Sequence, residues 1–138
     1  RHSTDLFVAS NILHEMVHAY ITLYYRCDPF AARKDYPQIQ AAWQRRNTFN
    51  YNDVQHREME RRFAGDIATA LREYSKRVNL FVDDIVFSDL AWGGLNFWNN
   101  DKLSYDEKRR IHNRLLAELS NSQVGEEKPA GVAIFDRR

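Results

Sequence analysis

The strongest constraint on this 138-residue chain is a long apolar stretch, Leu6 to Tyr25, that carries His14, Glu15 and His18 near its middle. Apolar residues recur on all sides of the helix that this stretch can form, which predicts a helix buried on nearly every side. Burying two imidazoles and a carboxylate is unfavourable unless they have partners. Residues four apart lie on one face of a helix, so both histidines can reach one cation. We therefore expect a metal site on a buried helix.

The residues from His14 to His18 form an HExxH motif. In zinc peptidases the two histidines of this motif hold zinc, the zinc activates a water, and the glutamate takes the proton of that water. Glu15 can approach such a water without being a ligand, and we predict it as the general base. Two hydrogen-bonded core histidines without a metal are the alternative interpretation.

A catalytic zinc usually takes three protein ligands, and the motif supplies two. No histidine occurs from Ala19 to Cys27, which excludes the HExxHxxGxxH pattern. His56 is the best candidate for the third ligand, because helical spacing puts it on the core-facing stripe of a helix predicted from 52 to 76. Glu60, on nearly the same stripe, and Asp66, at its edge, are the alternatives.

Three helices can be predicted from capping residues and apolar spacing. They begin after Ser3-Thr4-Asp5, after Asn52-Asp53 and at Ser104, and they end near Cys27, Lys76 and Asn121. The last helix is predicted to turn four residues inward: Ile111, Leu115, Leu116 and Leu119. The fold class is mainly α, with α+β as the alternative. We expect one compact helical domain over residues 1–121 and a C-terminal tail over 122–138.

The composition and the net charge argue against several classes of protein. Hydrophobic residues make up 43% of the chain, which predicts a folded domain. The net charge of +1 argues against a nucleic-acid partner, and the basic clusters are expected to be solvated helix faces. Polar residues in the middle of the first helix argue against a membrane span. Because the chain starts at Arg1, we expect a fragment of a longer protein.

Two segments carry a resemblance to a known family: LHEMVHAY at Leu13–Tyr20 and NDVQHREM at Asn52–Met59. They resemble the SprT-like zinc metallopeptidases, most closely members from Bacteroidetes-type bacteria, and LAWGGL at 90–95 adds to the likeness. The resemblance implies a single-zinc, zincin-like peptidase domain. It also implies that the three ligands and the general base match residues already singled out: His14, His18, His56 and Glu15.

The family includes proteases that act on DNA-crosslinked proteins and peptidase domains attached to secreted bacterial proteins and toxins. With Cys27 alone, this chain lacks the four-cysteine zinc ribbon of the repair type. We therefore expect zinc-dependent hydrolysis of a protein or peptide substrate, in the cytoplasm or as part of a secreted or injected bacterial protein. A toxin or effector would have a cognate inhibitor or immunity protein. The alternatives are a non-enzymatic interaction domain stabilised by zinc, and a protease acting on nucleic-acid-bound proteins.

Further residues could assist the chemistry. A second group that stabilises the oxyanion is common in such sites, and the candidates are Tyr20, Tyr51 and His112. Trp92-Gly93-Gly94 could line the substrate cleft, because glycine permits close backbone approach. A tight turn packed by Trp92 explains this segment equally well. The aromatic-rich segment from Asp28 to Tyr51 could form a flap over the cleft, and the alternative is an ordinary connection between the helices.

Overall fold

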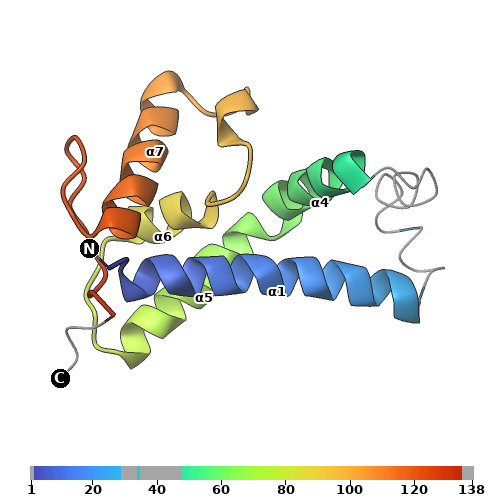
Figure 1. Cartoon of the computed structure of the whole chain (residues 1–138), viewed down its shortest axis with the longest axis horizontal. Coiled ribbons are helices and arrows are strands. Elements are labelled where there is room, and N and C mark those ends of the chain that lie inside the picture. The colour runs from blue at the N-terminus through green and yellow to red at the C-terminus, as the bar shows by residue number, and fades with distance from the viewer. Residues whose placement is uncertain (1, 29–33, 35–47, 135–138) are drawn as a thin grey trace.

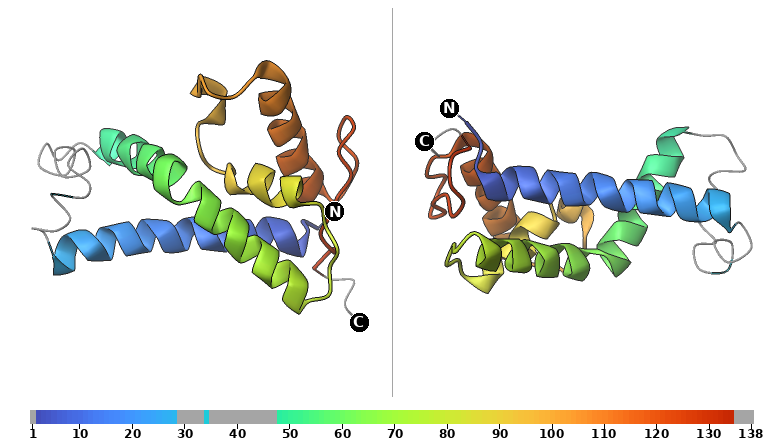
Figure 2. Two further views of the ribbon diagram at one scale, coloured as in Figure 1. Left: turned by 180° about the vertical axis from the view of Figure 1, so that it is seen from behind. Right: turned by 90° about the horizontal axis from the view of Figure 1, so that it is seen from below.

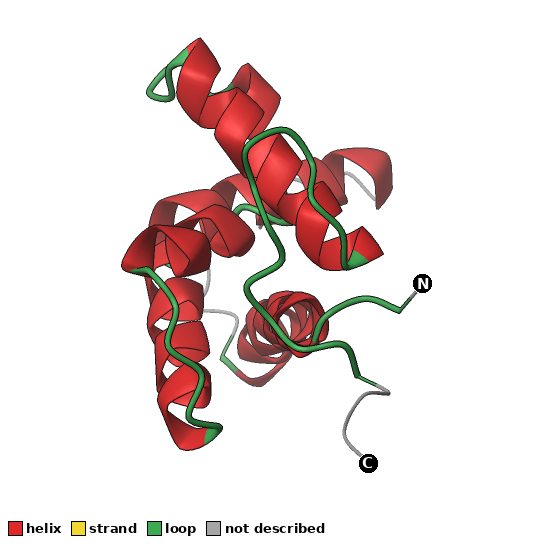
Figure 3. Cartoon of the chain, turned by 90° about the vertical axis from the view of Figure 1, so that its left-hand side faces the viewer, coloured by secondary structure: helices red, strands yellow, loops and turns green. Residues whose placement is uncertain are grey.

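The computed structural model describes residues 2–28, 34 and 48–134. Over these residues the fold is built from helices and contains no strand (Figure 3). The helices are α1 (Asp5–Cys27), α4 (Thr48–Arg62), α5 (Ala64–Arg77), α6 (Asp84–Ala91) and α7 (Tyr105–Ser120), with a short 3-10 helix, η1 (Phe97–Asn99). The prediction of a mainly α fold is confirmed. Most of the predicted flap lies outside the described residues.

Helix α1 runs along the long axis of the fold (Figure 1). It begins where the sequence predicts, because the Thr4 hydroxyl accepts a hydrogen bond from the backbone N–H of Phe7 at 3.2 Å and caps the first turn. It ends at Cys27, two residues before Pro29. Within the described part of the chain, no helix combines the length and apolar character that crossing a membrane requires.

The prediction that α1 is buried on nearly every side is wrong for one face. Leu6 and Ile21 are fully buried, but four large apolar side chains of the opposite face are each more than half exposed: Ile12, Met16, Tyr20 and Leu23. The other described helices pack against one side of α1, as the view along its axis shows (Figure 3). Apolar composition alone therefore overestimated how much of this helix is covered.

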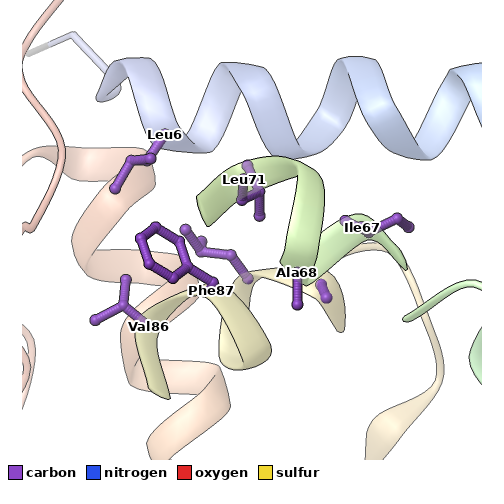
Figure 4. Packing of buried hydrophobic residues seen from close by; sticks show 8 residues of the cluster. Leu6, Ile67, Ala68, Leu71, Val86 and Phe87 are labelled. Carbon is purple, nitrogen blue, oxygen red and sulfur yellow. The ribbon is translucent and has the colours of Figure 1, made fainter. Parts of the chain in front are cut away.

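The main core lies where α5 crosses the N-terminal half of α1 and α6 packs against both helices (Figures 1 and 4). Leu6 of α1, Leu71 of α5 and Phe87 of α6 are each at most 2% exposed. Complete burial of a side chain of this size stabilises the folded chain by about 1.5–3 kcal/mol. These contacts fix the position of α1, and with it the positions of the HExxH residues.

The helix predicted from 52 to 76 is two helices with a bend between them (Figure 2). Backbone hydrogen bonds continue through the bend, because Phe63 donates to Met59 and accepts from Ile67, both at 2.8 Å. The helix also begins at Thr48, so the predicted cap at Asn52-Asp53 is wrong.

Helix α7 begins and ends as predicted, but its inward face differs. Ser104 and Glu107 form a capping box, and Asn121 ends the helix in the left-handed conformation. Ile111 is buried, whereas Leu116 and Leu119 are 38% and 48% exposed, which corrects their predicted orientation. The buried positions at the end of α7 are taken by three other residues: Arg114, Ala117 and Glu118.

The buried carboxylate of Glu118 joins the two ends of the described chain. It accepts hydrogen bonds from the Thr4 hydroxyl at 2.5 Å and from the backbone N–H groups of Ala130 and Gly131 at 2.6 and 3.1 Å. Arg114 pairs with it at 3.2 Å. The segment after α7 is thereby held against the start of α1, which explains why polar side chains displace leucines from this part of the interior.

We expect Glu118→Gln to lower the free energy of unfolding by roughly 3 kcal/mol, because it leaves the buried Arg114 without its full counter-charge. Urea denaturation of the purified variant measures this change. Glu126→Gln, at an exposed carboxylate, is the matched control and should differ from the native chain by less than about 0.5 kcal/mol. Equal stability of the two variants would contradict this account of Glu118.

Candidate metal centre

Three histidine side chains converge between α1 and α4. The Nε2 atom of His18 lies 3.1 Å from Nε2 of His14, on the same helix, and 3.1 Å from Nε2 of His56, on α4. One nitrogen from each residue falls within 4.8 Å of the others. Before the bend, α4 approaches the middle of α1 (Figure 2), and His56, near the middle of α4, supplies the third imidazole.

These separations suit a single ion. With metal–nitrogen bonds of about 2.1 Å in tetrahedral geometry, neighbouring ligand nitrogens lie about 3.4 Å apart. The two closest Nε2 pairs, at 3.1 Å, are near that value. Among the described residues, His14, His18 and His56 are the group that could hold a metal ion. The sequence-based choice of His56 over its acidic neighbours therefore agrees with the geometry.

Gln55 sets the orientation of the His18 ring. It is 2% exposed, and its side-chain oxygen accepts a hydrogen bond from the Nδ1–H of His18. With the proton on Nδ1, the lone pair of His18 Nε2 points into the cluster, which is the tautomer that a metal ion needs. Sequence reasoning assigned no role to Gln55. The available signal was its position directly before a candidate ligand, inside the NDVQH segment.

Gly94 supports the ring of His14 from the loop after α6. Its φ is +77°, a conformation that residues with a side chain rarely adopt. A Cβ atom added there would lie 2.8 Å from Cε1 and 3.1 Å from Nε2 of His14. The close approach at Gly94 is to the His14 imidazole. The segment 92–94 is not among the residues that line the cleft beside His56, and its predicted role in lining a substrate cleft stays a prediction.

Burial keeps His14 neutral. The pKa of His14 falls to about 4, first because the ring is buried and then because His18 and His56 lie close to it, while the Glu15 carboxylate opposes the shift. A neutral imidazole is the form that binds a metal ion. Among the described residues, Nδ1 of His14 has no hydrogen-bond partner.

The two acidic alternatives for the third ligand do not join the cluster. Glu60 lies one turn beyond His56 on α4, and its carboxylate accepts a hydrogen bond from the side-chain amide of Asn100. Asp66 is exposed on α5, beyond the bend. The prediction assumed one straight helix, whereas α4 and α5 differ in direction. It therefore placed Asp66 closer to His56 than Asp66 lies in the structure.

The three candidate oxyanion donors are not brought together by the described structure. The Tyr20 ring is about half exposed and stacks on Tyr24 with ring centres 5.9 Å apart. His112 is exposed on α7 and contacts the Trp98 ring at 5.7 Å. The side chain of Tyr51 lies outside the described part of the chain. Each of these roles stays a prediction.

A cleft of about 500 Å³ opens beside His56. Its walls come from α4 and from the loop around η1, and the residues that line it are of polar or charged types: His56, Arg57, Glu60, Asn96, Asn99, Asn100, Asp101 and Lys102. Glu15 is exposed next to the first histidine of α1. The histidine cluster is therefore open to molecules from solvent on at least the His56 side.

Comparison of the chain with models of protein families, with curated proteins and with solved structures found no match. The class of site therefore follows from three observations: three imidazoles that could bind one metal ion, an open cleft beside one of them, and the exposed Glu15 directly after His14 in the sequence. This combination defines a candidate metal centre.

We expect Gly94→Ala to weaken binding of a divalent transition-metal ion by about 10–100-fold, because the new methyl group displaces the His14 ring. Titration against a chromophoric chelator measures the affinity. Gly65→Ala is the matched control, since nothing lies within 4 Å of its added Cβ, and it should bind the ion like the native chain. Unchanged affinity in Gly94→Ala would show that Gly94 does not position His14.

Proposed function

We propose that this chain is a zinc-dependent peptidase in which His14, His18 and His56 bind zinc and Glu15 is the general base. The observation that carries the proposal is the convergence of three histidine nitrogens, two of them from an HExxH helix. Two histidines alone could be a hydrogen-bonded pair. Three Nε2 atoms around one point, with Nδ1 of His18 already used by Gln55, are better explained by a cation between them.

The donor set favours zinc among the common metals. Imidazole nitrogen suits zinc, copper, nickel and iron, whereas calcium and magnesium prefer oxygen ligands. Three protein ligands are the usual number for a catalytic zinc, which keeps a further position for water or substrate. When bound, zinc would acidify that water and polarise the carbonyl group of the scissile peptide bond.

Glu15 supplies the proton transfers that hydrolysis needs. In the proposed reaction its carboxylate accepts a proton from the attacking water as the water oxygen bonds to the carbonyl carbon. The carbon–nitrogen bond then breaks, and Glu15 passes the proton to the leaving amine. The residue is exposed and directly follows a ligand, so a substrate can reach it. A site that only stabilises the fold would need no base at this position.

The second candidate is a non-enzymatic interaction domain in which zinc holds two helices together. One observation favours it: besides the histidines, the buried residues that join α1 to α4 form a small cluster of Ile21, Met59 and Leu95. A zinc ion bridging the two helices would add substantially to this contact. This candidate explains the three histidines but leaves Glu15 without a role.

A protease on nucleic-acid-bound proteins has less support. In the basic clusters at 61–62, 72–77 and 108–110, six side chains pair with nearby carboxylates: Arg61, Arg62, Arg72, Lys76, Arg109 and Arg110. Pairing lowers the positive charge that these residues offer to phosphates.

We expect Glu15→Gln to keep its zinc and to lose at least about 100-fold in hydrolysis of an unfolded protein such as casein, because an amide cannot accept the proton. Zinc content by mass spectrometry and peptide release by chromatography are measured on the same preparation. Glu126→Gln, at a carboxylate far along the chain, is the control and should hydrolyse casein at the native rate.

The two candidates predict different results. If the native chain binds zinc but its peptide release equals that of Glu15→Gln, the peptidase proposal is contradicted and the structural role of zinc is favoured. If removal of zinc by a chelator leaves peptide release unchanged, zinc is not the cofactor of that reaction.

A further inference from the structure

The cleft beside His56 is lined by four charged side chains, and the surroundings of one of them, Glu60, differ from those of the other three. Arg57, Asp101 and Lys102 are exposed, so water and salt screen them strongly. Glu60 is only partly exposed. A charge that is partly shielded from water interacts more strongly with a ligand than a fully solvated one does.

Asn100 holds Glu60 in a defined orientation. The Asn100 side-chain amide, from the loop after η1, donates a hydrogen bond to Oε1 of Glu60. Oε2 has no hydrogen-bond partner among the residues that the structure describes. Burial raises the pKa of Glu60, while Asn100 and the charge of Lys102 lower it. The partly buried carboxylate therefore has one oxygen fixed by the protein and one oxygen able to accept from a ligand.

The carboxylate is also close to the candidate metal centre. Residues four apart on a helix are neighbours on its surface, about 5–6 Å apart between Cβ atoms, and Glu60 follows His56 at this spacing. Both residues line the same cleft. A peptide whose scissile bond lies at the histidine cluster would thus have a residue next to that bond within reach of Glu60.

We propose that Glu60 is a specificity determinant that binds a cationic group of the substrate, an ammonium or guanidinium, next to the scissile bond. The proposal rests on the proposed peptidase function and deepens it by naming a substrate class. The cation has two sources, a lysine or arginine side chain or the free amino terminus of a peptide. A preference for the first would define an endopeptidase for basic sites, and a preference for the second would define an aminopeptidase.

Four small amides can test the proposal without requiring hydrolysis. N-acetyl-lysine methylamide carries a side-chain ammonium, and N-acetyl-norleucine methylamide is its neutral counterpart. Alanine methylamide carries a free α-ammonium, and N-acetyl-alanine methylamide is the neutral counterpart. Each is titrated into the ¹⁵N-labelled native chain, with and without bound zinc, and binding is followed by NMR shifts around Glu60 and Asn100.

We expect one cationic amide to bind at least about fivefold more tightly than its neutral counterpart. Glu60→Gln, which keeps the shape of the side chain, should remove this difference. Asp101→Asn, at an exposed carboxylate of the same cleft, is the matched control and should retain it. The amide that shows the preference identifies the source of the cation.

Three results would overturn the proposal: no amide binds, cationic and neutral amides bind equally to the native chain, or the preference persists in Glu60→Gln. The comparison of cationic with neutral amides in the native chain tests the proposal even if Glu60→Gln does not fold. Failure of the peptidase function is seen separately, as absence of zinc-dependent casein hydrolysis. If casein is hydrolysed, sequencing of the products should show a basic residue or a free amino terminus at one fixed position, and Glu60→Gln should lose that bias.

Discussion

The convergence of three imidazoles from two helices is the interaction on which the proposed site depends. α1 supplies His14 and His18 one turn apart, and α4 brings His56 to the same point. Neither helix could form this cluster alone. The core between α1, α5 and α6 fixes the position of α1. Because the chain bends at Phe63, α5 crosses the N-terminal half of α1 while α4 approaches the middle of α1 (Figure 2). Gln55 and Gly94 set the orientations of the His18 and His14 rings. These contacts together bring three imidazole nitrogens to one small volume.

The parts of this arrangement that depend on local spacing could be predicted from the sequence. The ends of α1 and α7 follow from capping residues, and the three histidines follow from helical periodicity together with the HExxH motif. The parts that depend on tertiary contacts could not be predicted from the sequence. Met16 and Leu119 are apolar but exposed, because burial is decided by which face other helices cover. Arg114 and Glu118 are charged but buried, because backbone groups from residues 128–131 satisfy them.

In the proposed peptidase, the residues that carry out hydrolysis and the residue that selects the substrate occupy different positions of the site. α1 carries two ligands and the candidate base Glu15, whereas α4 carries the third ligand and, one turn later, Glu60 in the adjoining cleft. Under this proposal, the residue that selects the substrate is neither a ligand nor the base. A change at Glu60 can therefore alter which peptide binds without removing a ligand or the base, and a change at Glu15 can stop the reaction while the cleft keeps its shape.

The most direct measurement of the central claim is the metal content of the purified chain, native and His56→Ala, by mass spectrometry after exposure to zinc. The account predicts about one zinc per native chain and a loss of most of it in His56→Ala, because a ligand from the second helix is removed. His112→Ala, at an exposed histidine on α7, should keep the native content. A folded native chain that refuses zinc, or a His56→Ala chain that retains it in full, would contradict the three-histidine site.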